Sequence, residues 1–476
     1  SSVTKLLFWF ENRKIAQRRN MKKNVIFHRK LTTKDKITYG LGDVANQFIY
    51  GSLSAFILIF WTDVVGIAAA TASTMILVSK VWDGINDPLM GAFIDKHEFN
   101  GEKARPYFKW FAIPFGIAAV ICFISPDASM PVKVLYAFIA YNVTNMIYTI
   151  INIPYGILAT KMTSDVNERG TLNVFRMAFA MSGYAFVSLF VPFFVERAGY
   201  FYAFLILGII SVCIWFYVYA NSYELPMEEA EEKEHTVGFK VAAKNLIKNR
   251  VWIILTIGML ASNIASAMMG GSTAYYVQYY LGRPALVGIF LLLPTIGQII
   301  SLSLLTDKGF KKFGKIKMTQ ICLAGASIFS FAIYLLVGES PSATTLALLA
   351  VLLILAGMCI GPIMSATFAM LGDSIEYGEY KTGVRIEGLT YAGASLGQKV
   401  GAGLGTALVG YILAFYGYVP NAVQSTEALM GIRMVYVVAP IVFYIIYLVA
   451  LQFNPLDKIY KDVERELVKR RGMKGE

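Results

Sequence analysis

The chain has 476 residues, of which 56% are hydrophobic and 16% are charged, with a formal net charge of +12. Soluble globular domains have about 45–50% apolar and about 25% charged residues. The composition therefore excludes an ordinary soluble domain, a disordered chain and a disulfide-stapled secreted module. A membrane-spanning helix needs about 20 apolar residues, so we expect an all-α polytopic membrane protein.

The apolar segments follow one another with short polar connections, and helices are the structures that satisfy backbone polar groups in hydrocarbon without a closed barrel. We predict twelve transmembrane helices in two six-helix bundles. Their approximate ranges are 37–62, 67–93, 107–125, 131–159, 173–195, 198–220, 251–280, 284–305, 318–337, 343–370, 388–415 and 431–453.

The basic residues are distributed unevenly between the two sides that this arrangement defines. One side, which includes both termini, has 37 lysines and arginines, whereas the other side has four and two more lie within spans. Because cytoplasmic loops of membrane proteins are enriched in Lys and Arg, we expect both termini to be cytoplasmic. We therefore expect a multi-pass membrane protein. The bilayer accounts for the positive charge without nucleic acid.

The charge pattern also divides the chain into five parts. We expect a basic N-terminal segment at 1–36, bundles at 37–220 and 251–453, a charged linker at 221–250 and a tail at 454–476. Residues 1–20 form a basic, partly amphipathic stretch, which fits an interfacial helix, an extension ahead of Met21 or a cloning remnant. Two six-span halves are typical of transporters that move around a midplane site.

The second predicted span contains the densest group of charges. Asp83, Asn86 and Asp87 lie at i, i+3 and i+4, which places them on one face of a helix. Their oxygens would suit Na⁺ or H⁺, while Pro88 frees backbone carbonyls nearby. The structural alternative is an ion pair between Lys80 and one aspartate, but that pair alone leaves the second aspartate without a partner.

Two further spans carry polar side chains at helical spacing. Asp43, Asn46 and Gln47 share a face of the first span, where Asp43 either caps the helix or faces a cavity. In the fourth span, Thr149 and Asn152 precede a proline that we expect to break the helix, as in cavity-lining helices of transporters.

Three features lie outside these polar spans. Arg176 and Lys399 are further cations at membrane depth, and Lys399 lies well inside a glycine-rich span. The glycines between 393 and 405 predict close helix packing. We find no nucleophile triad, metal-ligand spacing or phosphate-binding loop, so we expect no enzyme activity, no cofactor and no metal other than Na⁺.

These patterns resemble the glycoside–pentoside–hexuronide cation symporters, a branch of the major facilitator superfamily that includes the melibiose carrier. The resemblance extends from about residue 31 to the tail and is closest to glucuronide carriers. It is carried by the motifs Tyr39-Gly40-Leu41-Gly42-Asp43, Thr62-Asp63-Val64-Val65-Gly66, Trp82-Asp83-Gly84-Ile85-Asn86-Asp87-Pro88, Asn152-Ile153-Pro154-Tyr155-Gly156 and the stretch from Asp373 to Tyr391.

The resemblance implies a secondary active symporter that couples Na⁺ or H⁺ entry to sugar uptake by alternating access. The implied cation site comprises Asp83, Asn86, Asp87 and Thr149. The predicted substrate site comprises Asp43, Asn46, Gln47, Asn152, Tyr155, Gly156, Arg176 and Lys399. Residues assigned to gating or coupling are Lys80, Asp95, Arg105, Asp373, Glu376, Arg385 and Glu387.

Departures from the melibiose carrier bear on the sugar. That carrier has carboxylates at the positions of Gln47 and Asn152 and a tryptophan at Gly156, so α-galactoside binding is not expected here. Losing two acids while keeping Arg176 and Lys399 favours an anion, because guanidinium pairs well with carboxylate. We expect a β-glucuronide or related hexuronide.

Several alternatives remain open. A neutral xyloside or galactoside, or a sulfonated sugar, is the main rival substrate. A lysolipid transporter, which would need an apolar lateral cleft, and a non-transporting sugar sensor are more distant alternatives.

Overall fold

The computed structural model describes residues 30–99, 101–163, 165–225, 239–339 and 341–456, together with 459–460, 462–463, 465–466 and 469. Within these ranges the regular secondary structure is helical, apart from one isolated β-bridge between Phe99 and Glu102. The expectations for residues 1–20, and most of those for the central linker, fall outside the described residues.

The first half of the molecule consists of helices α2 to α7. The first span is one uninterrupted helical stretch, whose segments are α2 (Thr33–Asn46), η1 (Gln47–Gly51), α3 (Ser52–Ile59) and η2 (Phe60–Val65). The following helices are α4 (Ala69–Lys96), α5 (Arg105–Cys122), α6 (Met130–Met162) and α7 (Val166–Asn221).

The second half consists of helices α8 to α16. Its first segments are α8 (Phe239–Ile247), α9 (Arg250–Tyr275), η3 (Tyr276–Tyr280), η4 (Pro284–Leu286) and α10 (Val287–Leu304). These are followed by α11 (Thr306–Phe313), α12 (Lys315–Leu336), α13 (Ala343–Thr382), α14 (Gly388–Phe415), α15 (Thr426–Arg433), η5 (Met434–Val438) and α16 (Ala439–Gln452).

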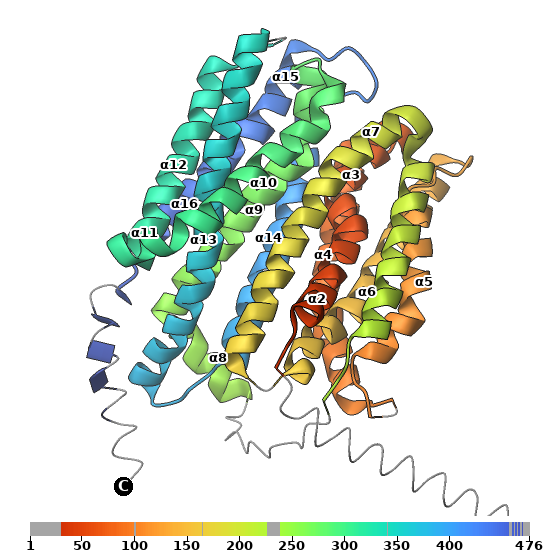
Figure 1. The fold of residues 1–476 in the computed structure, drawn as a ribbon. Coiled ribbons are helices and arrows are strands. Elements are labelled where there is room, and N and C mark those ends of the chain that lie inside the picture. Colours follow the sequence, from red (N-terminus) through yellow and green to blue (C-terminus); the bar gives the residue numbers. More distant parts are fainter. Residues whose placement is uncertain are drawn as a thin grey trace, which may run out of the picture.

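The two halves stand side by side as bundles of roughly parallel helices (Figure 1). We call the end at which α2 begins and α8 lies the terminal end, and the end at which α15 lies the far end. Helices α4 and α14, from different halves, pack against each other, as do α7 and α10. The candidate site therefore draws on helices from both halves.

Eight helices of the described part are long and apolar enough to cross a membrane by length and composition. One of them is α7, which bends at Gly199, where φ is 79° and ψ is 171°. This bend confirms the predicted break between the fifth and sixth segments. Helices α4 and α14 are not among the eight, although each carries charged residues of the candidate site.

Three local expectations are wrong. Helix α6 continues through Pro154 instead of breaking there. Helix α13 extends to Thr382, twelve residues beyond the predicted end of the segment. The capping alternative for Asp43 is wrong, because α2 begins at Thr33, ten residues earlier, where Thr32 and Asp35 form a reciprocal capping box.

Glycines allow α14 to pack closely on α9, as predicted. A Cβ added at Gly401 would lie 2.6 Å from the carbonyl oxygen of Leu260, and one at Gly405 would lie 2.5 Å from that of Ile264. Because the two glycines are four residues apart, one face of α14 lies directly on the α9 backbone. This contact fixes the position of Lys399, which lies less than one turn before Gly401.

Candidate functional site

The polar face of α4 forms as its spacing predicts, and its first acid has a basic partner. Lys80 Nζ lies 3.1 Å from Asp83 Oδ2 and donates to the Tyr50 hydroxyl at 3.1 Å. Both charged residues are buried, with exposed fractions of 7% and 6%. The other carboxylate oxygen, Asp83 Oδ1, is buried and has no hydrogen-bond partner among the described residues. It is a ligand atom that a small cation could use.

The second acid of α4 has its own partners from two other helices. Asp87 forms an ion pair with Lys399 of α14 and accepts a hydrogen bond from Thr149 Oγ1 of α6 at 3.0 Å. Lys399 thus supplies the partner that Lys80 alone could not give to both aspartates. The structure brings Lys399 to the predicted cation site. Its ion pair with Asp87 joins the second half of the molecule to the first at this site.

A third charged pair lies between α2 and α7. Arg176 Nε donates to Asp43 Oδ2 at 2.7 Å, and its guanidinium carbon lies 4.9 Å from the centre of the Tyr155 ring. Tyr155 donates through its hydroxyl to the Tyr39 carbonyl oxygen at 2.5 Å, and the two rings stack at 4.7 Å. Asp43 therefore fixes Arg176, and the guanidinium is neutralised in this conformation.

The amides predicted for the substrate site meet on the neighbouring turn. Asn46 Nδ2 donates to Asn152 Oδ1 at 3.3 Å, which joins α2 to α6. Gln47 begins the π-helical turn η1 and packs against Gly51 and Gly183. Gly156 is half-buried, and nothing lies within 4 Å of an added Cβ, so a side chain there would project into open space.

A cavity of about 260 Å³ lies between the halves beside Lys80. Sequence analysis did not assign most of the polar residues that line it to the site: Tyr50, Ser54, Tyr141, Tyr184, Asn263, Ser266 and Thr406. For most of them the available signal was their position in spans that also carry predicted site residues, whereas Asn263 was recognisable as an amide within an apolar span. Hydroxyl and amide groups can form hydrogen bonds with sugar hydroxyls, and tyrosine rings can stack on the face of a sugar ring.

The predicted gating residues of the first half pair within that half. Arg105 forms an ion pair with Glu102 and donates to the Tyr219 carbonyl oxygen at 2.8 Å. Glu224 accepts hydrogen bonds from the backbone amides of residues 103 to 105. The side chain of Asp95 is outside the described part.

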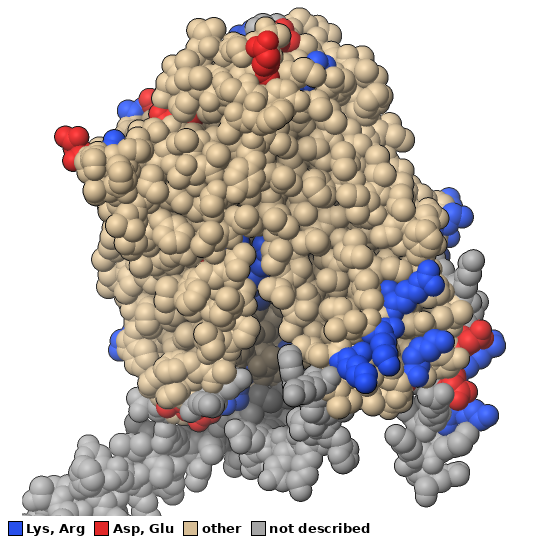
Figure 2. Space-filling view, turned by 180° about the vertical axis from the view of Figure 1, so that it is seen from behind, with Lys and Arg blue, Asp and Glu red and all other residues tan. Residues whose placement is uncertain are grey.

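The gating residues of the second half likewise stay within it. Lys315 Nζ lies 2.6 Å from Asp373, and Glu376 accepts from the Tyr460 hydroxyl at 3.0 Å. Arg385 binds Glu379 at 3.0 Å and Glu387 at 2.5 Å. Among the described residues, no ion pair therefore joins the two halves at the terminal end. Figure 2 shows a hollow between the halves that opens toward this end, with basic side-chain atoms visible inside it.

The far end is closed by a cluster that sequence analysis missed. Asp63 of the first half accepts hydrogen bonds from the hydroxyls of Tyr279 and Tyr418 of the second half. Its neighbour Thr62 lies 2.8 Å from the Tyr275 hydroxyl, and Asn421 donates to the Asp63 carbonyl oxygen. Asp63 was noted only as part of a motif, although an acid at the end of an apolar span was a usable signal.

Solved membrane transporters share this architecture of two helical halves. The structure resembles the nucleoside transporter NupG, with a TM-score of 0.61 and 14% identity over 88% of this chain and 99% of that one. It also resembles a bacterial homologue of the human lysosomal transporter Spinster, with a TM-score of 0.63 and 12% identity over 88% of this chain and 98% of that one. These similarities show that the chain shares the fold of these transporters.

Sequence comparison identifies the family. The profile of the MFS/sugar transport protein family matches residues 38–458. The putative glycoside/cation symporter YagG of Escherichia coli K12 is 31% identical over 94% of this chain and 97% of its own. The isoprimeverose transporter of Lactiplantibacillus pentosus (31%, covering 92% and 91%) and a glucuronide carrier protein homolog of E. coli (30%, covering 93% and 97%) are comparable. The chain belongs to the glycoside–pentoside–hexuronide symporter family of the major facilitator superfamily.

Proposed function

We propose that the protein is a symporter that couples Na⁺ or H⁺ entry to uptake of a β-glucuronide or related hexuronide. The observation that carries the proposal is Lys399, which reaches from the second half to Asp87 in the cation cluster of the first half. A residue shared in this way can transmit the state of one site to the other.

The cation site consists of oxygens from Asp83, Asn86, Asp87 and Thr149. A hard cation prefers such ligands, and Asp83 Oδ1 is already buried without a hydrogen-bond partner in the described part. Lys399 occupies Asp87, so an incoming Na⁺ or proton must take the place of its ammonium group. Cation binding therefore releases Lys399.

The released ammonium would then be available to the sugar. A uronide carboxylate can bind Lys399 once the cation holds Asp87, and it can compete with Asp43 for Arg176. The sugar ring would lie in the cavity bordered by Tyr50, Tyr141 and Asn263. Since each ligand favours the protein state that binds the other, coupling is reciprocal.

We further propose twelve spans, with both termini in the cytoplasm of a bacterial cell and the protein acting as a monomer. The 37 basic residues on the side of the termini support this orientation. The far end, closed around Asp63, would then face outward, and the hollow at the terminal end would open to the cytoplasm. The conformation would be inward-facing.

A neutral glycoside is the second candidate substrate. Arg176 and Lys399 are both paired with aspartates in this conformation. The paired charges leave a site of little net charge, which suits a neutral sugar.

The first experiment is counterflow in proteoliposomes with a labelled β-glucuronide, chased with unlabelled uronide or the matching neutral glycoside, with and without Na⁺. We expect the uronide to chase about 10- to 100-fold better, because hydrogen bonds to charged groups contribute about 1.5–3 kcal/mol. Arg176→Gln should reduce uronide exchange more than neutral exchange, while Arg250→Gln removes the same charge outside the site. Better exchange of the neutral glycoside would contradict the uronide assignment and keep the symporter.

A further inference from the structure

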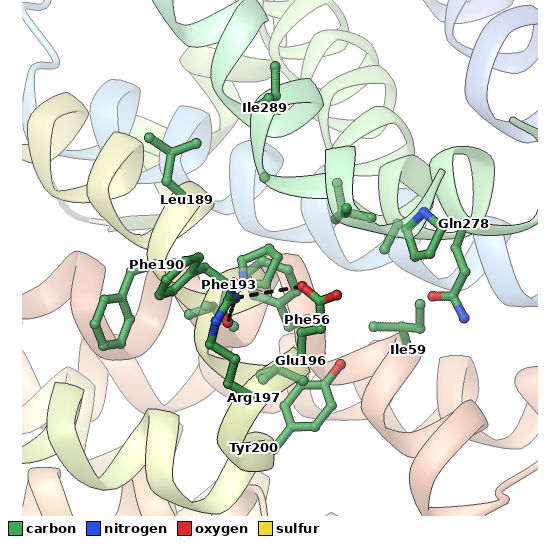
Figure 3. Close-up of a pocket in the computed structure, with 18 of the residues that line it drawn as sticks. Phe56, Ile59, Leu189, Phe190, Phe193, Glu196, Arg197, Tyr200, Gln278 and Ile289 are labelled. Atoms are coloured by element: carbon green, nitrogen blue, oxygen red, sulfur yellow. Dashed lines mark hydrogen bonds and ion pairs between the residues drawn. The ribbon is translucent and has the colours of Figure 1, made fainter. Parts of the chain in front are cut away.

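A large apolar groove lies on the seam between the halves, separate from the polar site. Its cavity measures about 800 Å³, and it is lined by Phe186, Phe190 and Phe193 of α7, Phe56 and Ile59 of α3, and Ile289 of α10 (Figure 3). None of the residues assigned above to the cation or substrate site lines it. It therefore needs an occupant of a different chemical kind.

The groove opens sideways toward the surroundings of the bundle. Phe193 is 53% exposed and Ile289 is 44% exposed, although both side chains are wholly apolar. Partway along the groove, α7 and α10 approach closely, and a Cβ added at Gly288 would lie 2.6 Å from the Ser188 carbonyl oxygen. Phe186 and Ile289 line the groove on the terminal-end side of this contact. The walls of this membrane protein thus form an apolar slot that is open to hydrocarbon.

The other end of the groove is charged. Arg197 stacks over the Phe193 ring at 3.7 Å, donates to the Phe193 carbonyl oxygen at 2.9 Å and lies 3.7 Å from Glu196. A depression of about 510 Å³ continues from Glu196 to Arg283, which comes from the other half. The rim therefore presents two guanidinium groups and one carboxylate, a net charge of +1.

The position of these arginines is unusual for their side of the molecule. The side opposite the termini has only four basic residues, and two of them are Arg197 and Arg283 at this rim. Guanidinium groups bind phosphate oxygens in bidentate geometry. An apolar slot with arginines at one end matches an acyl chain below an anionic phosphate.

We propose that this groove binds an anionic phospholipid of the phosphatidylglycerol type. One acyl chain lies along the phenylalanines of α7 and α3, and the phosphodiester binds Arg197 and Arg283. The net charge of −1 on the headgroup neutralises the rim. The headgroup lies at the far-end surface, and the chain points along the slot toward Phe186 and Ile289.

Native mass spectrometry of the full-length protein, titrated with phosphatidylglycerol or phosphatidylethanolamine of the same chain length, tests the proposal. The wild type should retain phosphatidylglycerol in preference to phosphatidylethanolamine. The double variant Arg197→Gln/Arg283→Gln should lose this preference, with at least about a tenfold weaker retention of phosphatidylglycerol. The matched control Lys133→Gln removes a charge on the same side and should bind as the wild type does.

A second pair of variants tests the slot itself. Ile289→Trp or Leu189→Trp fills the groove and should reduce retention of both lipids, whereas Ile328→Trp places the same bulk on an exposed position of α12. Thermal unfolding in detergent identifies any variant that fails to fold, so the two groove variants check each other. Equal binding of the two lipids, or unchanged binding in the double arginine variant, would overturn the proposal.

Discussion

The acidic side chains that the candidate site depends on are each held by a basic partner. Asp83 is paired with Lys80, Asp87 with Lys399 and Asp43 with Arg176. Burying an unpaired charge is far more costly than burying a pair. The pairing explains how these charges are tolerated at membrane depth, and it means that a ligand must exchange with a resident partner.

That exchange predicts the behaviour of Lys399→Gln. Removing the ammonium group removes the competitor for Asp87, so the coupling cation should bind more tightly. We expect its dissociation constant to fall by about tenfold, which lies within the usual range of coupling energies. The measurement is the Na⁺ concentration, or the pH, at half-maximal fluorescence change of Trp82, which is adjacent to Asp83. Lys133→Gln is the control, and unchanged or weaker cation binding in Lys399→Gln would contradict the competition.

At the scale of elements, α14 is the helix whose packing the site depends on. It contacts α9 through Gly401 and Gly405 and places Lys399 opposite α4. The small-residue pattern predicted this close packing from sequence. It could not predict the partner helix, because α9 and α14 are more than 100 residues apart in the chain.

Gly405→Ala should therefore destabilise the protein by about 1–3 kcal/mol, since the added methyl group meets the Ile264 carbonyl oxygen and the surrounding helices must shift. Thermal unfolding in detergent measures this effect. Gly388→Ala, on the same helix, adds its methyl group where nothing lies within 4 Å. Equal stability of the two variants would show that the crossing relaxes without cost.

At the scale of the whole molecule, hydrogen bonds at the far end join the two halves, in addition to the Asp87–Lys399 ion pair. Asp63 accepts two tyrosine hydroxyls from the second half, while the ion pairs described at the terminal end remain within one half. The carboxylate therefore acts as a lock between the halves. A lock must open for the central site to become accessible from the far end.

Asp63→Ala should shift the equilibrium toward a far-end-open state. A hydrogen bond to a charged group stabilises the closed state by about 1.5–3 kcal/mol. Losing it therefore corresponds to a change of about 10- to 100-fold in the ratio of open to closed states. Spin labels at Val64 and Val423, which are exposed and belong to different halves, report the separation in a cysteine-free background. Asp127→Ala, an exposed acid of the first half, is the control, and an unchanged distance distribution would show that Asp63 does not hold the halves together.

The sequence by itself determined the class of architecture and the polar faces of the helices. Apolar length and the i, i+3, i+4 spacing are local properties, so the cluster on α4 and the packing glycines of α14 could be identified without coordinates. The interaction partners of the α4 aspartates could not be identified in this way, because Asp87, Thr149 and Lys399 come from three different helices. The tertiary structure alone decided that Lys399 pairs with Asp87 of the predicted cation cluster, that Asp63 joins the halves at the far end and that the groove on the seam exists. Each of these depends on how helices from the two halves, which are distant in sequence, face each other.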